Sequence, residues 1–323
     1  MKVIHLVLSE DFAGIEQHVD ELLANNLDVK PILICNETIA DNFNDKINIY
    51  KLKNIGRRSF IGKHRLNKLL TKLSPDIVHT HGSKTTTIIS SINKKNYKHI
   101  ATVHGIKKNK RTYEKADFVI GVSKNAVDGI NNNTRIVTNW WNPKLSNLPV
   151  SKKKYALAIG RLEKIKGFDY LIESWKNINT ELIIIGSGKE KKSLLRLINQ
   201  KNLSNKIKII DGMKSDDLRE FYKNASVLII SSRDEGGPRV ALEALYLQIP
   251  VLSTNVGHMD LIFPNELLAE KNNQTALQKL LESHVDRIDW LNQSAIFDFV
   301  RNEFSIDKKI SEINEVYDLV LVN

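Results

Sequence analysis

A chain of 323 residues is longer than one hydrophobic core usually supports and short for three, which favours two domains of ordinary size. Hydrophobic residues make up 41% of the sequence and charged residues 26%, which is a globular composition and excludes a disordered chain. The formal net charge of +11 favours anionic partners such as phosphates, anionic lipid surfaces or nucleic acid, and charge alone does not choose among them.

The first half of the chain alternates short apolar segments with amphipathic ones, a pattern typical of parallel strands joined by crossover helices. The predicted strands cover residues 3–8, 29–35, 47–52, 76–80, 99–104 and 117–123. Basic residues crowd into the same half, at 52–72, 93–99 and 107–111. Each of these basic runs is, by itself, most simply a solvated face of the protein.

The cysteine content and the start of the chain bear on the compartment. Cys35 is the single cysteine, so no internal disulfide or CxxC metal site is available. The apolar run before Ser9 is too short for the core of a signal peptide, and no run approaches the roughly 18 apolar residues of a membrane-spanning helix. We therefore expect a cytoplasmic protein.

A change in composition separates two series of strands. Residues 140–154 carry two prolines and a lysine run, and this segment is the predicted interdomain linker. The strands predicted after it cover 155–160, 181–186, 206–211, 226–231 and 250–254, with helices at 169–177 and 189–200 among them. The last residues have apolar positions at helical spacing and are long enough to reach back to the first domain.

These elements predict an α/β protein with two Rossmann-like domains that face a cleft. The predicted N-terminal domain covers residues 1–145 and the C-terminal domain covers 146–303. A final helix over 304–323 is expected to pack back on the N-terminal domain.

The segment SSRDEGGPRVALEALYLQIPVL carries two glutamates, Glu235 and Glu243. Between them, Gly236 and Gly237 let another molecule approach the backbone, and the following proline suits the first turn of a helix. The N–H groups at such a helix start favour a ligand rich in oxygen or phosphate. The two glutamates are roughly 9 Å apart along the helix axis. This separation is too large for a retaining glycosidase, whose two carboxyl groups lie about 5 Å apart. The segment alone leaves open whether they bind hydroxyl groups or are ordinary helix-surface glutamates.

A second motif, GRLEKIKG, follows the first strand of the second half. Arg161 stands at the carboxyl end of the strand, and Lys166 precedes Gly167. The planar guanidinium and the compact ammonium suit a diphosphate whose negative charge grows as it leaves. In isolation, two surface cations in a strand-to-helix turn explain the motif equally well.

Taken together, GRLEKIKGFDYLI, EGGPRVALEAL, DIVHTHG, ATVHG and DFVIGVSK resemble the family 4 retaining glycosyltransferases of GT-B architecture. The resemblance covers nearly the whole chain in the family's order, and its most specific element is E-x7-E preceded by GRLxxxKG about 70 residues upstream. It implies retaining, metal-independent transfer of a sugar from a nucleotide-diphosphate donor, with a UDP-sugar expected. It also implies a saccharide or lipid-linked acceptor in bacterial surface polysaccharide or lipopolysaccharide assembly.

The resemblance assigns roles to the charged residues of both motifs. Arg161 and Lys166 match the cations that hold the donor diphosphate. Glu235 matches the glutamate that faces the donor sugar, and Glu243 matches the one that binds the ribose hydroxyls. With His104 of ATVHG, which matches a histidine beside the transferred sugar, Arg161, Lys166 and Glu235 form the expected catalytic set. The resemblance implies no enzyme nucleophile.

Glycines complete the expected donor site. Gly236 and Gly237 match the family's close-approach turn, where Gly237 replaces the usual aromatic residue. Gly14 matches the second glycine of an N-terminal pair near the phosphates, and Ala13 replaces the first.

Two further histidines carry weaker signals. His81, in HTHG, is more simply a structural histidine at a strand end. His258 replaces the second glycine of a loop in which the family has a glutamate after a glycine pair, and Asp260 stands at the glutamate position. No catalytic role is assigned to this altered loop.

The remaining motifs exclude several cofactors. IGSGKEK begins like a dinucleotide fingerprint, but Lys191 stands where the third glycine belongs, and there is no P-loop. No Asp-x-Asp metal motif occurs in a nucleotide-binding context, so no metal and no cofactor is expected and protein cations would replace the ion.

Two alternative functions stay open. A nucleotide-sugar epimerase of the same fold would need an acid and a base on the sugar ring, and the two motifs together disfavour it. A basic nucleic-acid-binding protein is suggested by charge alone, and aromatic residues are only 7% of the chain. No nucleic-acid partner is therefore expected.

The basic segment 51–72 suggests an anionic membrane surface as a partner. Its basic residues include Lys53, Arg57, Arg58 and Lys63. If part of it is helical, its leucines share one face, as in an interfacial helix or in an ordinary crossover helix packed on a sheet. Both interpretations hold together if the leucines point inward and only the basic loop with Phe60 touches lipid. The expected localisation is then the inner face of the plasma membrane.

Overall fold

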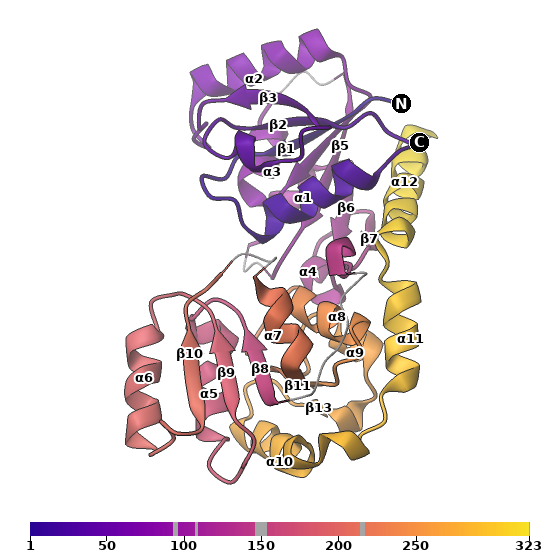
Figure 1. Ribbon diagram of the computed structural model, residues 1–323. Coiled ribbons are helices and arrows are strands. Elements are labelled where there is room, and N and C mark those ends of the chain that lie inside the picture. Colours follow the sequence, from indigo (N-terminus) through magenta and orange to yellow (C-terminus); the bar gives the residue numbers. More distant parts are fainter. Residues whose placement is uncertain (93–95, 107–108, 146–153, 214–216, 323) are drawn as a thin grey trace. The chain divides into compact units, whose positions relative to one another are not determined.

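The computed structural model describes residues 1–92, 96–106, 109–145, 154–213 and 217–322. The chain forms two compact units, of which unit 1 contains Met1–Asn139 and Ile306–Asn323 and unit 2 contains Trp140–Ser305 (Figure 1). Each unit has a parallel sheet with helices on both faces, so the predicted α/β class with two Rossmann-like domains is confirmed. Parts of the predicted linker and of two basic runs, at 146–153, 93–95 and 107–108, lie outside the described residues.

Unit 1 is built on a parallel sheet with the strand order β3-β2-β1-β4-β5-β6-β7 among the described residues. The strands are β1 (Val3–Val7), β2 (Ile32–Asn36), β3 (Asn48–Leu52), β4 (Ile77–His81), β5 (Lys98–Val103), β6 (Phe118–Gly121) and β7 (Thr134–Ile136). The first six lie where the apolar segments predicted them. β7 was not predicted, because its three residues are exposed or half-buried and carry no apolar run.

Helices cover both faces of this sheet. They are α1 (Gly14–Asn25), α2 (Phe60–Leu73), α3 (Ser83–Ser90), α4 (Lys124–Val127) and α12 (Ile306–Val322), with 3-10 turns η1 (Ala40–Asn42) and η2 (Tyr113–Lys115). Val19 and Leu23 of α1 pack on one face, while Leu66 and Leu70 of α2 pack on the other.

The C-terminal helix α12 belongs to unit 1 and contacts α1. Asn26 donates a side-chain hydrogen bond to Asn314 at 2.9 Å, and Arg135 forms a 2.6 Å ion pair with Glu315. Tyr317, in the middle of the helix, is fully buried. The last helix is therefore part of the core of unit 1.

Unit 2 has the strand order β10-β9-β8-β11-β12-β13 among the described residues. The strands are β8 (Tyr155–Ile159), β9 (Leu182–Ile185), β10 (Ile207–Ile210), β11 (Ala225–Ile230), β12 (Val251–Thr254) and β13 (Leu268–Ala269). The helices are α5 (Phe168–Glu173), α6 (Lys191–Gln200), α7 (Leu218–Asn224), α8 (Arg239–Tyr246), α9 (Met259–Ile262), α10 (Gln274–His284) and α11 (Ser294–Glu303). Short 3-10 segments are η3 (Pro143–Leu145), η4 (Lys164–Lys166), η5 (Asn265–Leu267) and η6 (Val285–Trp290).

The strand order of unit 2 determines which loops become neighbours. The chain runs outward from β8 through β9 to β10, then returns to place β11 on the other side of β8. Such a reversal in strand order opens a crevice at the carboxyl ends of the two central strands, where ligands of open α/β sheets bind. The loops after β8 and β11 are the two that carry the charged motifs of the sequence. In the part of the chain that the structure describes, no helix is long and apolar enough to cross a bilayer.

Candidate functional site

An ion pair joins the two motifs of unit 2. Lys166 lies in η4 after β8, and Glu235 lies in the loop after β11. Nζ of Lys166 is 2.8 Å from Oε1 of Glu235, and their side chains are 19% and 12% exposed. The sequence assigned each residue a role separately, and the structure brings them together because β8 and β11 are adjacent parallel strands.

The backbone around this pair is closely packed. Gly167 has φ +64°, and a Cβ at this position would lie 2.0 Å from the carbonyl oxygen of Ser231, so glycine is required here. The hydroxyl of Ser231 donates to the carbonyl oxygen of Lys166 at 2.9 Å. The hydroxyl of Ser232 donates to Oε1 of Glu235 at 2.5 Å. Ser231 therefore holds the backbone of Lys166, and Ser232 holds the carboxylate of Glu235. Neither serine was predicted from the sequence.

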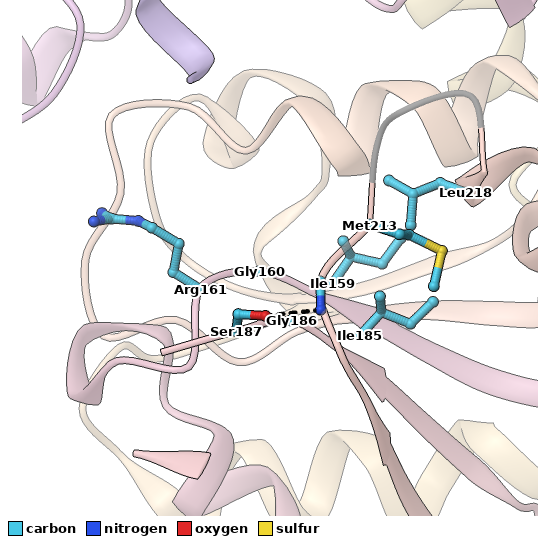
Figure 2. Close-up of a pocket in the computed structure, with 9 residues that line it drawn as sticks. Ile159, Gly160, Arg161, Ile185, Gly186, Ser187, Met213 and Leu218 are labelled. Atoms are coloured by element: carbon cyan, nitrogen blue, oxygen red, sulfur yellow. Dashed lines mark hydrogen bonds between the residues drawn. The ribbon is translucent and has the colours of Figure 1, made fainter. Parts of the chain in front are cut away.

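Arg161 occupies a different environment from Lys166. Its side chain is 71% exposed and its guanidinium forms a 2.9 Å ion pair with Glu163 two residues later. Figure 2 shows this side chain extending away from the apolar side chains of the adjacent cavity. An exposed pair of this kind contributes little to stability, so Arg161 is available to exchange its carboxylate partner for an anionic ligand.

A cavity of about 350 Å³ lies at the carboxyl ends of β8, β9 and β10 (Figure 2). Apolar side chains from these strands and from the segment after β10 line it, namely Ile159, Ile185, Met213 and Leu218. Gly160 and Gly186 form its backbone wall, where a Cβ on Gly186 would lie 1.9 Å from the carbonyl oxygen of Gly160. The sequence did not predict this cavity, because its apolar residues look like ordinary strand ends.

Glu243 lies one turn into α8 and is only 5% exposed. Its Oε2 accepts a 2.7 Å hydrogen bond from the hydroxyl of Tyr222 in α7. Burial and the neighbouring carboxylate raise the pKa of Tyr222 well above its usual value, so the tyrosine keeps its proton and remains a donor. No pattern in the sequence indicated Tyr222, which lies 21 residues before its partner.

The glycine turn before α8 packs against the altered loop. Gly257 has φ +64°, and a Cβ there would lie 2.8 Å from Cα of Gly237. The next residue, His258, is fully buried with its ring centre 5.6 Å from that of Phe304. This histidine therefore fills a packing position in unit 2, whereas Asp260 is exposed.

In unit 1, Gly14 is the first residue of α1, directly after the loop that leaves β1. A Cβ on Gly14 would meet no described atom within 4 Å, so packing within the described structure does not require glycine there. The helix start is held by Glu16, which accepts a 2.9 Å hydrogen bond from the backbone N–H of Ala13 and a second one from the hydroxyl of Ser9.

His104 follows β5 and is partly buried. Its Nε2 is 3.0 Å from Nδ1 of His81, and the opposite nitrogen of His81 is 3.0 Å from Nδ1 of His5. From the sequence, His104 was predicted to be functional and His81 to be structural. In the structure the two rings are hydrogen-bonded to each other.

Two family models match the chain. "Glycosyl transferases group 1" matches residues 143–287, and "Glycosyl transferase 4-like" matches residues 4–132. An uncharacterized glycosyltransferase of Methanocaldococcus jannaschii is 28% identical over 296 residues, covering 83% of this chain and 84% of that protein. The amylovoran biosynthesis glycosyltransferase AmsD of Erwinia amylovora is 29% identical over 157 residues, covering 44% of each protein.

Solved structures share the fold over almost the full length. The lipopolysaccharide outer core galactosyltransferase WaaB has a TM-score of 0.81 at 18% identity, covering 98% of this chain and 99% of that one. Anabaena Alr3699/HepE in complex with UDP-glucose has a TM-score of 0.77 at 16% identity, with the same coverage of both chains. At these identities the structures are evidence for the fold alone.

Proposed function

Because the chain belongs to the family 4 glycosyltransferases of GT-B architecture, we propose that it moves a sugar from a UDP-sugar to a saccharide or lipid-linked acceptor with retained anomeric configuration. The observation that carries this proposal is the pairing of Lys166 with Glu235 where the loops after β8 and β11 meet. Names among the relatives, amylovoran biosynthesis and lipopolysaccharide outer core, support an acceptor in surface polysaccharide assembly. HepE was solved with UDP-glucose, and we propose the same class of donor, a UDP-sugar, for this chain.

The donor would lie along the carboxyl edge of the unit 2 sheet. The apolar cavity beside Gly160 and Gly186 suits a nucleotide base, since it combines apolar side chains with a backbone edge. Glu243 would bind the ribose hydroxyls, with the Tyr222 hydroxyl orienting its carboxylate. Gly236 would let the diphosphate approach the backbone before α8.

The charged residues would act on the reacting bonds. As the bond from the anomeric carbon to the diphosphate breaks, negative charge grows on the leaving group, and the ammonium of Lys166 and the guanidinium of Arg161 would stabilise it. The acceptor hydroxyl attacks the anomeric carbon on the same face, and its proton passes to the departing diphosphate. Glu235 would accept hydrogen bonds from sugar hydroxyls, and His104 would contact the transferred sugar. No step here needs a divalent metal.

Product analysis tests this function. UDP-, GDP- and ADP-sugars are each incubated with lipid-linked saccharides, with and without EDTA, and the products are characterised by mass spectrometry and NMR. We expect transfer from a UDP-sugar, an anomeric configuration equal to that of the donor, and activity that persists in EDTA. An inverted product or a strict requirement for added metal would contradict the mechanism. Epimerised donor formed without acceptor would favour the epimerase alternative.

Replacing Arg161 tests the diphosphate site. We expect Arg161→Ala to weaken binding of UDP about tenfold in calorimetry, since a charge-assisted hydrogen bond is lost at an exposed position. Arg196→Ala removes an exposed arginine of α6 and serves as the control. Equal affinity of the Arg161 variant and the wild type would rule out this role.

We also propose that α2 and the preceding loop bind an anionic membrane surface. Leu66 and Leu70 point into the core, and Leu69 and Leu73 pack against it partly buried, so the leucines of α2 are directed at the sheet. At the start of the helix, however, Phe60 is 87% exposed and Ile61 is 70% exposed. Ser59 caps this helix start by accepting from the backbone N–H of Gly62 at 3.1 Å.

Lys53, Arg57 and Arg58 precede these two apolar residues in the sequence and are exposed, and Lys63, which follows them in α2, is partly exposed. Each basic group near an anionic leaflet contributes about 1 kcal/mol, so three or four would give reversible attachment. This arrangement corresponds to the combined interpretation from the sequence, with the leucines inward and Phe60 outward.

Vesicle sedimentation tests this attachment. We expect binding to anionic vesicles of phosphatidylglycerol but not to zwitterionic phosphatidylcholine, and binding at least about thirtyfold weaker after Arg57→Glu with Arg58→Glu, since two attractive groups are lost and two repulsive ones are added. Raised salt should have a similar effect, because the attraction is screened. Equal binding to both vesicle types would leave a soluble saccharide as the better acceptor.

A further inference from the structure

Three buried histidines meet on one face of the unit 1 sheet. His79 and His81 are two residues apart on β4, so both point to the same face, and His5 lies on the neighbouring strand β1 in register with His79. They are 1% (His5), 0% (His79) and 3% (His81) exposed. Burial lowers the pKa of His5 to about 3 and keeps the pKa values of His79 and His81 well below their usual range. All three are therefore neutral near pH 7.

Every ring nitrogen of these three histidines has a partner. His79 uses Nε2 with the hydroxyl of Thr102 at 2.6 Å and Nδ1 with the hydroxyl of Tyr317 at 2.8 Å. The same tyrosine hydroxyl is 3.3 Å from Nε2 of His5. Nδ1 of His5 then meets Nε2 of His81, and Nδ1 of His81 meets Nε2 of His104, both at 3.0 Å. The result is one unbranched series of hydrogen bonds, here called the histidine chain.

The rings are close enough to suggest a metal ion, but their orientation favours hydrogen bonding. Ligand atoms of His5, His79 and His81 lie within 4.8 Å of one another. However, the ring centres of His5 and His81 are 5.2 Å apart while their nearest nitrogens are 3.0 Å apart, so these nitrogens point at each other. The pair His81 and His104 has the same two distances. Metal ligands would instead direct their lone pairs to a common point.

Neutral imidazole has one donor nitrogen and one acceptor nitrogen. If the ring of His81 donates to His104, it must accept from His5, and His5 must then accept from Tyr317. If His104 donates to His81, every bond along the chain reverses. The protonated nitrogen of His104 is therefore coupled to the direction in which the Tyr317 hydroxyl points. Such series of hydrogen bonds strengthen one another in a buried environment.

We propose that one of these two directions prevails, so that the histidine chain holds His104 in a single tautomer, and that Tyr317 of α12 is a positioning residue for it. The inference deepens the proposed function, because it rests on the role of His104 at the transferred sugar. Through Tyr317, the C-terminal helix α12 would then help to orient the ring of His104 during transfer. Tyr317 stands 312 residues from His5 in the sequence, yet its hydroxyl lies between His79 and His5 and connects them within the histidine chain.

Nitrogen-15 NMR of histidine-labelled full-length protein tests the tautomer directly. In the wild type, His104 should show one protonated and one unprotonated ring nitrogen. Tyr317→Phe keeps the buried ring but removes the hydroxyl, so His104 should shift to a mixture of tautomers. We expect kcat to fall about tenfold, with the affinity for UDP unchanged, since the charged residues proposed to bind the nucleotide, Arg161, Lys166 and Glu243, belong to unit 2.

Tyr113→Phe is the matched control. Tyr113 is also fully buried in unit 1, and its hydroxyl has no hydrogen-bond partner among the described residues. The variant should leave both the His104 spectrum and kcat unchanged. Thr102→Val breaks the far end of the chain and should repeat the Tyr317 effect more weakly, whereas Thr102→Ser should restore wild-type behaviour.

The outcomes separate this inference from the proposed function. An unchanged His104 spectrum in Tyr317→Phe would overturn the proposal that Tyr317 sets the tautomer of His104, whatever the activity. A changed spectrum with unchanged kcat would overturn the role of His104 in transfer. Stoichiometric binding of Zn²⁺ that perturbs the spectra of His5, His79 and His81 together would mean that these residues form a metal site and would overturn the proposal.

Discussion

Glu235→Ala is expected to lower kcat by about 10²- to 10³-fold while the protein stays folded. The carboxylate is held by Lys166 and by the hydroxyl of Ser232, so its position is fixed before any substrate arrives. A preorganised polar group at the reacting centre typically contributes about 3–4 kcal/mol to transition-state stabilisation. Initial rates with a saturating UDP-sugar, together with thermal unfolding, measure the two effects separately.

Stability is expected to change much less than activity. Removing one partner of a partly buried ion pair costs about 1–3 kcal/mol, which lowers Tm by about 2–4 °C for each kcal/mol in a domain of this size. Asp234→Asn is the control, because Asp234 is the neighbouring carboxylate and pairs only at 3.6 Å with Lys271. Near-normal turnover of Glu235→Ala with the correct donor would exclude the sugar-binding role.

Local sequence patterns were sufficient to predict β1 to β6 and β8 to β12. Each predicted strand is a run of β-branched and apolar residues, and this composition fits a strand buried on both faces. β7 and β13 escaped prediction because they have only three and two residues. These short segments become strands because they pair with β6 and β12, and a local sequence pattern does not show which strand a segment will pair with.

Spatial pairing was less accessible than local structure. Lys166 and Glu235 are 69 residues apart, and their contact depends on β11 returning to the side of β8 opposite β9. The sequence shows five strands in series but not their order in the sheet. Only the resemblance to a family placed the two residues on one ligand.

The histidine chain shows the same limit more clearly. The spacing of two residues in HTHG already places His79 and His81 on one face of a strand. Nothing local connects them to His5 or to Tyr317, because those contacts require the order of β1 and β4 and the docking of the last helix. A buried polar group needs a partner, but the sequence does not say which one.

Lys166→Met is expected to lower kcat/KM for transfer by about 10²- to 10³-fold. The variant keeps much of the length and packing of the side chain but removes the cation from the position where the diphosphate charge would develop. UDP binding should weaken less than transfer does, because the charge on the leaving group increases as the glycosidic bond breaks and the lost interaction is strongest at that point.

Lys164→Met is the control, since Lys164 is an exposed lysine of the same 3-10 turn. It should retain nearly all of the activity. The double variant Lys166→Met with Glu235→Ala should be far less damaged than the product of the two single effects, because each residue positions the other through the 2.8 Å contact. Fully additive losses would mean that the contact between Lys166 and Glu235 does not persist in the reacting enzyme, and the two residues would then act independently on diphosphate and sugar.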